Sequence, residues 1–140
     1  MNAMAEGGKT KRLIGTMEAV CEAKGRVRVN GAVASERTFR MQMEVMKQFA
    51  RTLHELGYMV EDCENLGEKH INAVFDAWVG RGLSSKTLQN QKSRVKQFFH
   101  WMGKKNLGEY VSGIEGRYVE KMPNGFRVKT VAEESKSWRG

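Results

Sequence analysis

Apolar residues recur every three or four positions over four stretches of the chain. This spacing places apolar side chains on one face of an α-helix. The pattern predicts four helices, over residues 10–24, 36–56, 66–80 and 85–102. The first, second and fourth are each followed by a glycine, and the third ends at one, because glycine favours the end of a helix: Gly25, Gly57, Gly103 and Gly80.

Three of the predicted helices begin beside a side chain that can accept a hydrogen bond from the first helical turn. Ser35 would cap the second helix, and Ser84 or Ser85 the fourth. Asn65 and Glu68 have the spacing of a capping box for the third helix. The capping residues and the glycines therefore mark the same helix boundaries as the apolar spacing. The sequence predicts an all-α fold of four packed helices.

The regular spacing decays after Gly103. Apolar residues between 110 and 119 predict either a short helix or an extended segment lying over the bundle. A turn at residues 122–126, between Val119 and Val128, is compatible with a small hairpin. Arg26–Gly31 alternates and predicts an extended loop or hairpin arm. We expect a disordered N-terminus (1–9), a helical domain (10–108) and an extension or linker (109–140).

Size and composition narrow the class of protein. A chain of 140 residues with 40% hydrophobic residues can form one domain with one core. Its longest apolar runs are too short for a membrane span, and its N-terminus lacks the apolar segment of a secretory signal. Cys21 and Cys63 have no metal-ligand spacing, so we interpret them as reduced structural thiols of a cytoplasmic protein. No metal site and no cofactor is expected.

Charge is distributed unevenly along the chain, whose net charge is +8. Residues 36–76 carry five basic and eight acidic side chains, whereas residues 77–108 carry no acidic one. The basic residues of this second segment are Arg81, Lys86, Lys92, Arg94, Lys96, Lys104 and Lys105. The fold should therefore have one cationic side, which favours a nucleic acid as partner. A membrane surface is disfavoured because the apolar faces are needed for the core.

The fourth predicted helix combines this charge with an apolar stripe. At 100° per residue the stripe contains Leu88, Val95, Phe98, Phe99 and Met102. Polar residues lie opposite or on the flanks: Lys86, Thr87, Gln89, Asn90, Ser93, Arg94, Lys96, Gln97, His100 and Lys104. Lysine and arginine neutralise phosphates, and the amides and hydroxyls can contact phosphates or base edges. Ser84, Ser85 and the first free amides form the positive end of the helix dipole.

Two other interpretations of this face remain open. It could be a solvated, lysine-rich surface that serves solubility, although such surfaces usually mix both charge signs. It could also meet an acidic protein partner. Trp101 falls towards the polar side, where it either anchors the segment after Gly103 or stacks near DNA, and the anchor is favoured because exposed tryptophan is unusual.

The stretch Gly82-Leu83-Ser84-Ser85-Lys86-Thr87-Leu88, followed by Phe98-Phe99-His100-Trp101, resembles the core-binding domain of tyrosine recombinases, the phage integrases. The resemblance covers roughly residues 10–125. It extends back through Arg37-Thr38-Phe39, Phe49, Leu53, Gly57-Tyr58, Leu66 and His70-Ile71. It also extends forward, because Gly113–Val119 resembles the segment that follows this domain in a group of proteobacterial prophage integrases.

The resemblance implies a SAM-like four-helix bundle that grips one side of a DNA duplex as half of a C-shaped clamp. The implied partners are double-stranded DNA and other integrase protomers. The helix pattern and the resemblance together predict these DNA contacts: Arg37, Ser84, Ser85, Lys86, Thr87, Asn90, Arg94, Gln97 and Lys104.

The sequence departs from the family in the residues that perform catalysis. Recombinase chemistry requires an Arg, a Lys, a His-x-x-Arg motif and a nucleophilic Tyr on a second domain. His54, His70 and His100 are each followed three residues later by glycine or alanine, so the motif is missing. We therefore expect a DNA-binding module without catalytic activity of its own.

Overall fold

A computed structural model of the chain describes residues 7–25 and 35–126. These residues form α-helices and short 3-10 helices, and no strand occurs among them. The α-helices are α1 (Gly8–Lys24), α2 (Glu36–Glu55), α3 (Glu68–Gly80), α4 (Ser85–Trp101) and α5 (Lys105–Ser112). The 3-10 helices are η1 (Cys63–Asn65) and η2 (Ile114–Tyr118). The all-α prediction is confirmed, with one α-helix more than the four expected.

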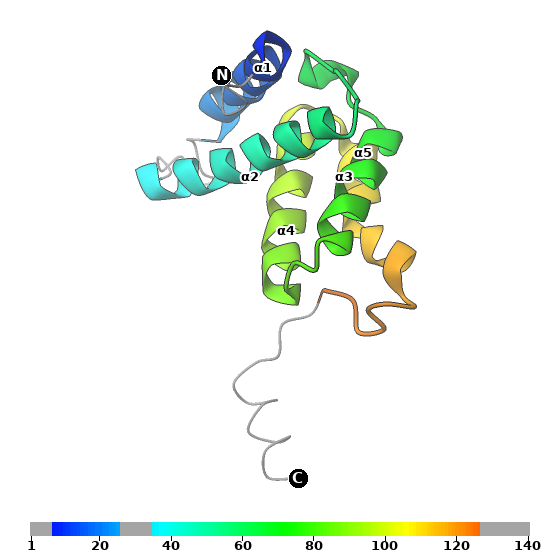
Figure 1. The fold of residues 1–140 in the computed structure, drawn as a ribbon. Helices are drawn as coiled ribbons and strands as arrows, with labels where there is room; N and C mark the ends of the chain where they lie inside the picture. The colour runs from blue at the N-terminus through cyan, green and yellow to red at the C-terminus, as the bar shows by residue number, and fades with distance from the viewer. Residues whose placement is uncertain (1–6, 26–34, 127–140) are drawn as a thin grey trace.

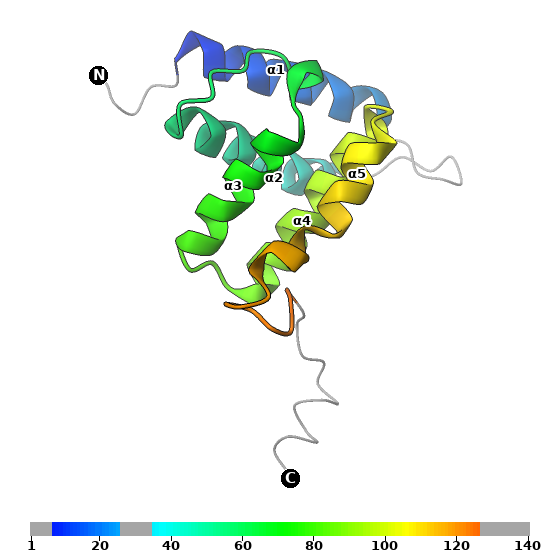
Figure 2. The same ribbon diagram turned by 90° about the vertical axis from the view of Figure 1, so that its right-hand side faces the viewer.

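The helices form two groups that cross each other. Figure 1 shows α2 running across the molecule with α1 beside it, and α3 and α4 descending from this pair. In Figure 2 the turned view shows α5 lying along α4, with η2 and the last described turn at the lower end. α4 and α5 make the most extensive helix–helix contact in the fold. The faces where the two groups meet form the core.

The predicted starts of α2 and α4 are confirmed. The Ser35 hydroxyl accepts the Thr38 N–H at 3.1 Å, and the Ser84 hydroxyl accepts the Thr87 N–H at 3.2 Å. The predicted start of α3 is wrong, because Asn65 lies in η1 and the N-cap is Gly67. The Gly67 N–H instead donates to Nδ1 of His70 at 2.9 Å. A histidine three residues after the cap therefore does what we expected of Glu68.

The predicted end of the third helix is confirmed, because α3 ends at Gly80. Gly82, two residues further on, takes the left-handed conformation with φ of 78°. Gly103 ends α4 in the same conformation, with φ of 77°. The Lys104 N–H reaches the Phe99 carbonyl at 2.9 Å, which closes the last turn. Glycine is favoured at both positions because a Cβ disfavours positive φ.

Most of the predicted apolar face of each helix lies in the core. Leu56, the last residue of the second predicted helix, follows α2 and is 44% exposed, and Met102 of the α4 stripe is half-buried. The largest fully buried side chains come from α1, α2, α3 and α4 and from the last described turn: Leu13, Met17, Met46, Phe49, Leu53, Ile71, Phe75, Trp78, Leu88, Phe98, Phe99 and Phe126. No helix among the described residues is long and apolar enough to cross a membrane.

The core continues beyond residue 108, where the predicted helical domain ends. Val111, Ile114, Tyr118 and Phe126 are all buried. The Phe126 ring stacks on Phe75, with ring centres 6.5 Å apart. Residues 119–126 form turns, and the expected hairpin is not seen there. Residues 109–126 thus complete the core instead of leaving it.

Two carboxylates hold this extension against the bundle. Glu115 pairs with Lys92 of α4 and accepts the Phe126 N–H at 2.8 Å. Burial raises the pKa of the Glu115 carboxyl, but the bonds from Lys92 and the Phe126 amide outweigh it, and the pKa is lowered. Asp76 of α3 accepts the Tyr118 hydroxyl at 2.7 Å. The last described turn is therefore fixed to α3 and to α4.

Several predicted features lie outside the described residues. These are most of the segment 1–9, which we expected to be disordered, the arm predicted over Arg26–Gly31, and Val128 with the residues that follow it. Gly8 and Lys9 were expected to precede the first helix, and they form its first turn.

The two cysteines are free and buried. Burial raises the pKa of Cys21 to about 12, and burial also raises the pKa of Cys63. The Cys63 N–H donates to the Thr16 hydroxyl at 3.1 Å, which ties η1 to α1. Thiols held in their protonated form are poor nucleophiles, so both side chains behave as core residues.

The Phe126→Ala variant tests whether the extension is part of the core. Phe126 is 0% exposed, and loss of a buried Phe ring should lower the free energy of unfolding by about 3–5 kcal/mol. Urea denaturation followed by circular dichroism measures this. Val119→Ala is the control: Val119 is 57% exposed, and its truncation should change the value by less than about 0.5 kcal/mol.

The cap of α3 predicts a pH-dependent stability. Burial, with a smaller contribution from Lys69, lowers the pKa of His70. The neutral ring accepts the Gly67 N–H, and this contribution is complete above the unfolded pKa of about 6.5. It is lost as the pH falls through the folded pKa, so the midpoint of urea unfolding should decrease from pH 7 to pH 5. His70→Gln retains an acceptor that does not titrate, and an equally steep decrease in this variant would contradict the assignment.

Candidate nucleic-acid interface

The N-terminus of α4 is built by a serine–threonine pair. The Ser84 hydroxyl accepts the Thr87 N–H and donates to Oγ1 of Thr87 at 3.0 Å. Both hydroxyls are thus engaged in the cap. The amides of Ser85 and Lys86 precede the first complete turn of α4, where a helix has no carbonyl of its own to bond them. They form the positive end of the helix dipole.

The outer face of α4 is polar as predicted. Lys86, Asn90, Ser93 and Gln97 are exposed along one side of the helix. Arg94 is half-buried. It lies on the flank of α4 that faces α2, where its main-chain carbonyl accepts Nε2 of Gln42 at 2.9 Å. The opposite flank meets α5, where the His100 ring lies against the backbone of Gly108. The open part of the face therefore lies between α2 and α5.

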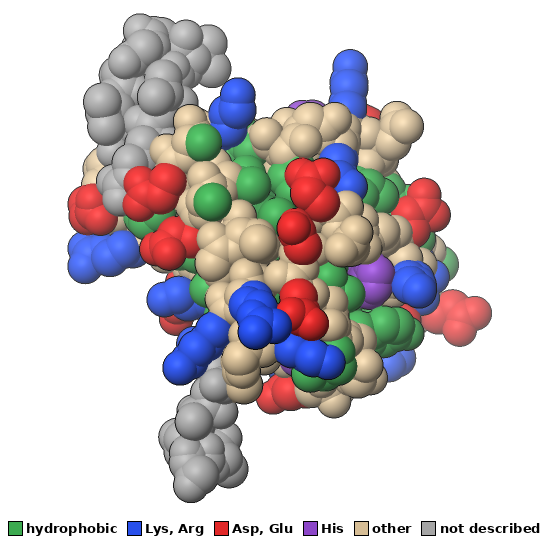
Figure 3. All heavy atoms as spheres, turned by 90° about the horizontal axis from the view of Figure 1, so that it is seen from above, with side chains coloured by type: hydrophobic (Ala, Val, Ile, Leu, Met, Phe, Trp, Pro, Cys, Tyr) green, Lys and Arg blue, Asp and Glu red, His purple; other side chains and the backbone are tan. Residues whose placement is uncertain are grey.

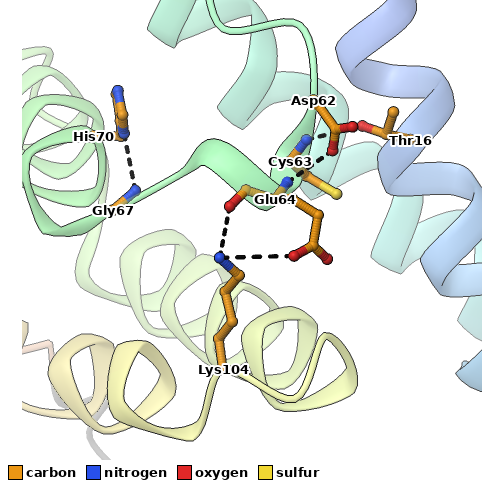
Figure 4. Close-up of polar contacts among 7 residues, drawn as sticks. All are labelled: Thr16, Asp62, Cys63, Glu64, Gly67, His70 and Lys104. Carbon is orange, nitrogen blue, oxygen red and sulfur yellow. Dashed lines mark hydrogen bonds and ion pairs between the residues drawn. The ribbon is translucent and has the colours of Figure 1, made fainter.

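Three cations of the basic segment have partners from other parts of the chain. Arg81 pairs with Glu55 at 2.7 Å, and Lys92 pairs with Glu115. Figure 4 shows the Lys104 side chain directed towards Glu64 of η1. Its ammonium donates to the Glu64 main-chain carbonyl at 2.6 Å and lies 3.9 Å from the Glu64 carboxylate. Acidic residues distant in sequence thus neutralise three of the seven basic residues of the segment.

Four cations of this segment are left without an acidic partner. Within residues 7–25 and 35–126, no carboxylate lies within 4.0 Å of Lys86, Arg94, Lys96 or Lys105. Lys86 and Arg94 belong to the predicted contacts, together with Asn90 between them. By contrast, the end of the molecule seen from above in Figure 3 mixes acidic and basic side chains. Three of these cations, Lys86, Arg94 and Lys96, belong to α4.

The structure places Arg37 apart from the start of α4. Arg37 lies in the first turn of α2, and both views show the start of α4 at the lower end of the molecule, below α2. A groove of about 560 Å³ lies between α1 and α2. Arg37 lines it with Arg40 and Lys47, and the acidic residues Glu18 and Glu44 line it too. Arg37 and Lys104 remain predicted DNA contacts, but they lie outside the outer face of α4.

Sequence reasoning did not select Arg40 and Lys47, although a signal was present. Ser35-Glu36-Arg37-Thr38 and Ser84-Ser85-Lys86-Thr87 share a Ser-x-basic-Thr pattern, and both fold into the same hydroxyl cap. The repeat would have drawn attention to the basic residues that follow Arg37 on α2.

Trp101 is an anchor, but its contact differs from the one expected. The ring packs against Gly25, where a Cβ would lie 2.8 Å from Cη2 of the indole. The tryptophan therefore joins the end of α4 to the end of α1. Its ring is half-buried in this contact, away from the exposed row on α4.

Comparison with known proteins gives one match. The family model described as "Phage integrase, N-terminal" matches residues 17–108, more than half of the chain. The matched region contains the second half of α1, all of α2, α3 and α4, and every predicted contact residue. No curated protein and no solved structure matches the chain.

Proposed function

Because the chain belongs to the phage integrase N-terminal family, we propose that it binds duplex DNA through the outer face of α4. The observation that carries the proposal is the row formed by the exposed Lys86 and Asn90 and the half-buried Arg94, and no carboxylate among the described residues lies beside its two cations. A cationic face without acidic neighbours attracts a polyanion over several ångströms.

The geometry of α4 supports separate roles for its side chains. Lys86 and Arg94 are eight residues apart, about two helical turns, and would neutralise phosphates of the backbone. The free amides of Ser85 and Lys86 would add a phosphate contact at the helix end. Asn90 and Gln97 carry amides that can pair with base edges in the major groove. Affinity would thus come mostly from the charges and selectivity from the amides.

The proposal gives this chain a binding role in DNA integration and recombination. Strand cleavage would depend on catalytic groups that the sequence lacks, and other integrase protomers would share the DNA. The protein would act in the cytoplasm of a bacterial host, where its duplex target is accessible. With phosphate contacts dominant, non-specific binding should have a dissociation constant of about 10⁻⁴–10⁻⁶ M at physiological salt.

A salt titration of a labelled duplex tests the proposal. The logarithm of the affinity should fall linearly with the logarithm of the salt concentration. Lys86→Ala/Arg94→Ala should weaken binding and reduce the slope by about two, because two phosphate contacts are lost. Lys105→Ala/Lys121→Ala removes the same charge from exposed positions outside α4 and should retain the slope of the parent.

Two outcomes would contradict this assignment. If the parent does not bind the duplex even in dilute salt, the chain is not a DNA-binding module. If both double variants lose affinity equally, binding depends on net charge and not on the α4 face.

Incubation with supercoiled plasmid tests the absence of catalysis. The chain should produce neither nicks nor a protein–DNA adduct that survives denaturing electrophoresis, because a covalent intermediate requires an activated nucleophile. Tyr118 donates its hydroxyl to Asp76 and is buried, and no His-x-x-Arg motif accompanies any tyrosine. An adduct abolished by a tyrosine-to-phenylalanine substitution would disprove this expectation.

A further inference from the structure

The crossing of α2 and α4 contains buried glutamines. Gln42 of α2 and Gln91 of α4 are each 2% exposed. Nε2 of Gln42 donates to the main-chain carbonyl of Arg94, and Nε2 of Gln91 donates to Oε1 of Gln48 at 2.8 Å. The two helices are therefore joined at this crossing by directional polar contacts, although the rest of the core is largely apolar.

These contacts leave two polar atoms without partners. Among the described residues, neither Oε1 of Gln42 nor Oε1 of Gln91 has a hydrogen-bond donor. A buried acceptor without a donor destabilises a fold, and native proteins usually pair such atoms. Methionine would fill a similar volume at either position without an unpaired oxygen. Stability alone therefore does not explain the two glutamines.

Their bonds lead directly to the candidate interface. The acceptor of the Gln42 amide is the carbonyl of Arg94, and Gln91 is the residue after Asn90. A hydrogen bond depends on both distance and angle, so it fixes the rotation of a helix more tightly than apolar contacts do. The side chains that α4 directs outward depend on that rotation.

We propose that Gln42 and Gln91 are positioning residues that fix the rotation of α4 against α2, so that Asn90 and Arg94 face the duplex together. This inference rests on the proposed function for the identity of the ligand. Its structural part, the control of α4 orientation, holds for the free protein and can be measured without DNA.

The variants Gln42→Met and Gln91→Met test the inference, and Gln89→Met is the matched control. Gln89 is a half-buried glutamine on the other flank of α4, so the control makes the same chemical change away from the crossing. Residual dipolar couplings of the free proteins report the orientation of α4 relative to α2. Thermal unfolding reports stability, and the salt titration described above reports duplex binding.

We expect both crossing variants to change the orientation of α4 while their melting temperatures equal or exceed that of the parent. Their duplex affinity should fall by about threefold to tenfold, a size seen for residues that act on a site without touching the ligand. The salt slope should stay unchanged, because no cation is removed. Gln89→Met should match the parent in all three measurements.

The outcomes separate this inference from the proposed function. An unchanged α4 orientation in both crossing variants would overturn the inference, and so would a melting temperature several degrees below the parent. Parent-like duplex affinity despite a changed orientation would overturn it as well. A parent that binds no duplex, with the orientation changed in the variants, would refute DNA binding and support the role of the glutamines in fixing α4.

Discussion

The fold depends on the burial of one side of α4. Leu88, Val95, Phe98 and Phe99 are fully buried, and each contributes apolar area that stabilises the folded state. Turning α4 by half a revolution about its axis would expose these four side chains to solvent and bury the lysines of α4. The same constraint that forms the core therefore determines which residues point outward, and the polar row on α4 is a consequence of how the core packs.

Long-range ion pairs then determine how much of the α4 charge remains available. Glu55, Glu64 and Glu115 come from other segments of the chain and pair with Arg81, Lys104 and Lys92 of the basic segment. The pair between Lys92 and Glu115 is largely shielded from solvent and also orients the last described turn. Folding thus pairs Arg81, Lys92 and Lys104 with acidic residues and leaves Lys86, Arg94, Lys96 and Lys105 without a carboxylate partner among the described residues.

The sequence was sufficient to predict what depends on local chemistry. Helix positions followed from apolar spacing, and the serine caps of α2 and α4 followed from the preference of helix starts for small hydroxyl residues. Two contacts were not predicted, for different reasons. The cap made by His70 is local, three residues from Gly67, but asparagine and glutamate are the more usual capping residues, so the sequence favoured Asn65 and Glu68. The contact of Lys104 with η1 joins residues 40 positions apart, and no pattern within a single segment indicates it.

The burial of Phe126 has a consequence for how the chain folds during synthesis. Its ring covers Phe75, which in turn contacts Trp78 with ring centres 5.1 Å apart. The four predicted helices leave the ribosome before this ring, so for a time the nascent chain presents an aromatic surface that its own later residues must cover. Exposed apolar surface of this kind is where nascent chains aggregate or recruit chaperones. A fast translation of residues 109–126 would shorten that interval.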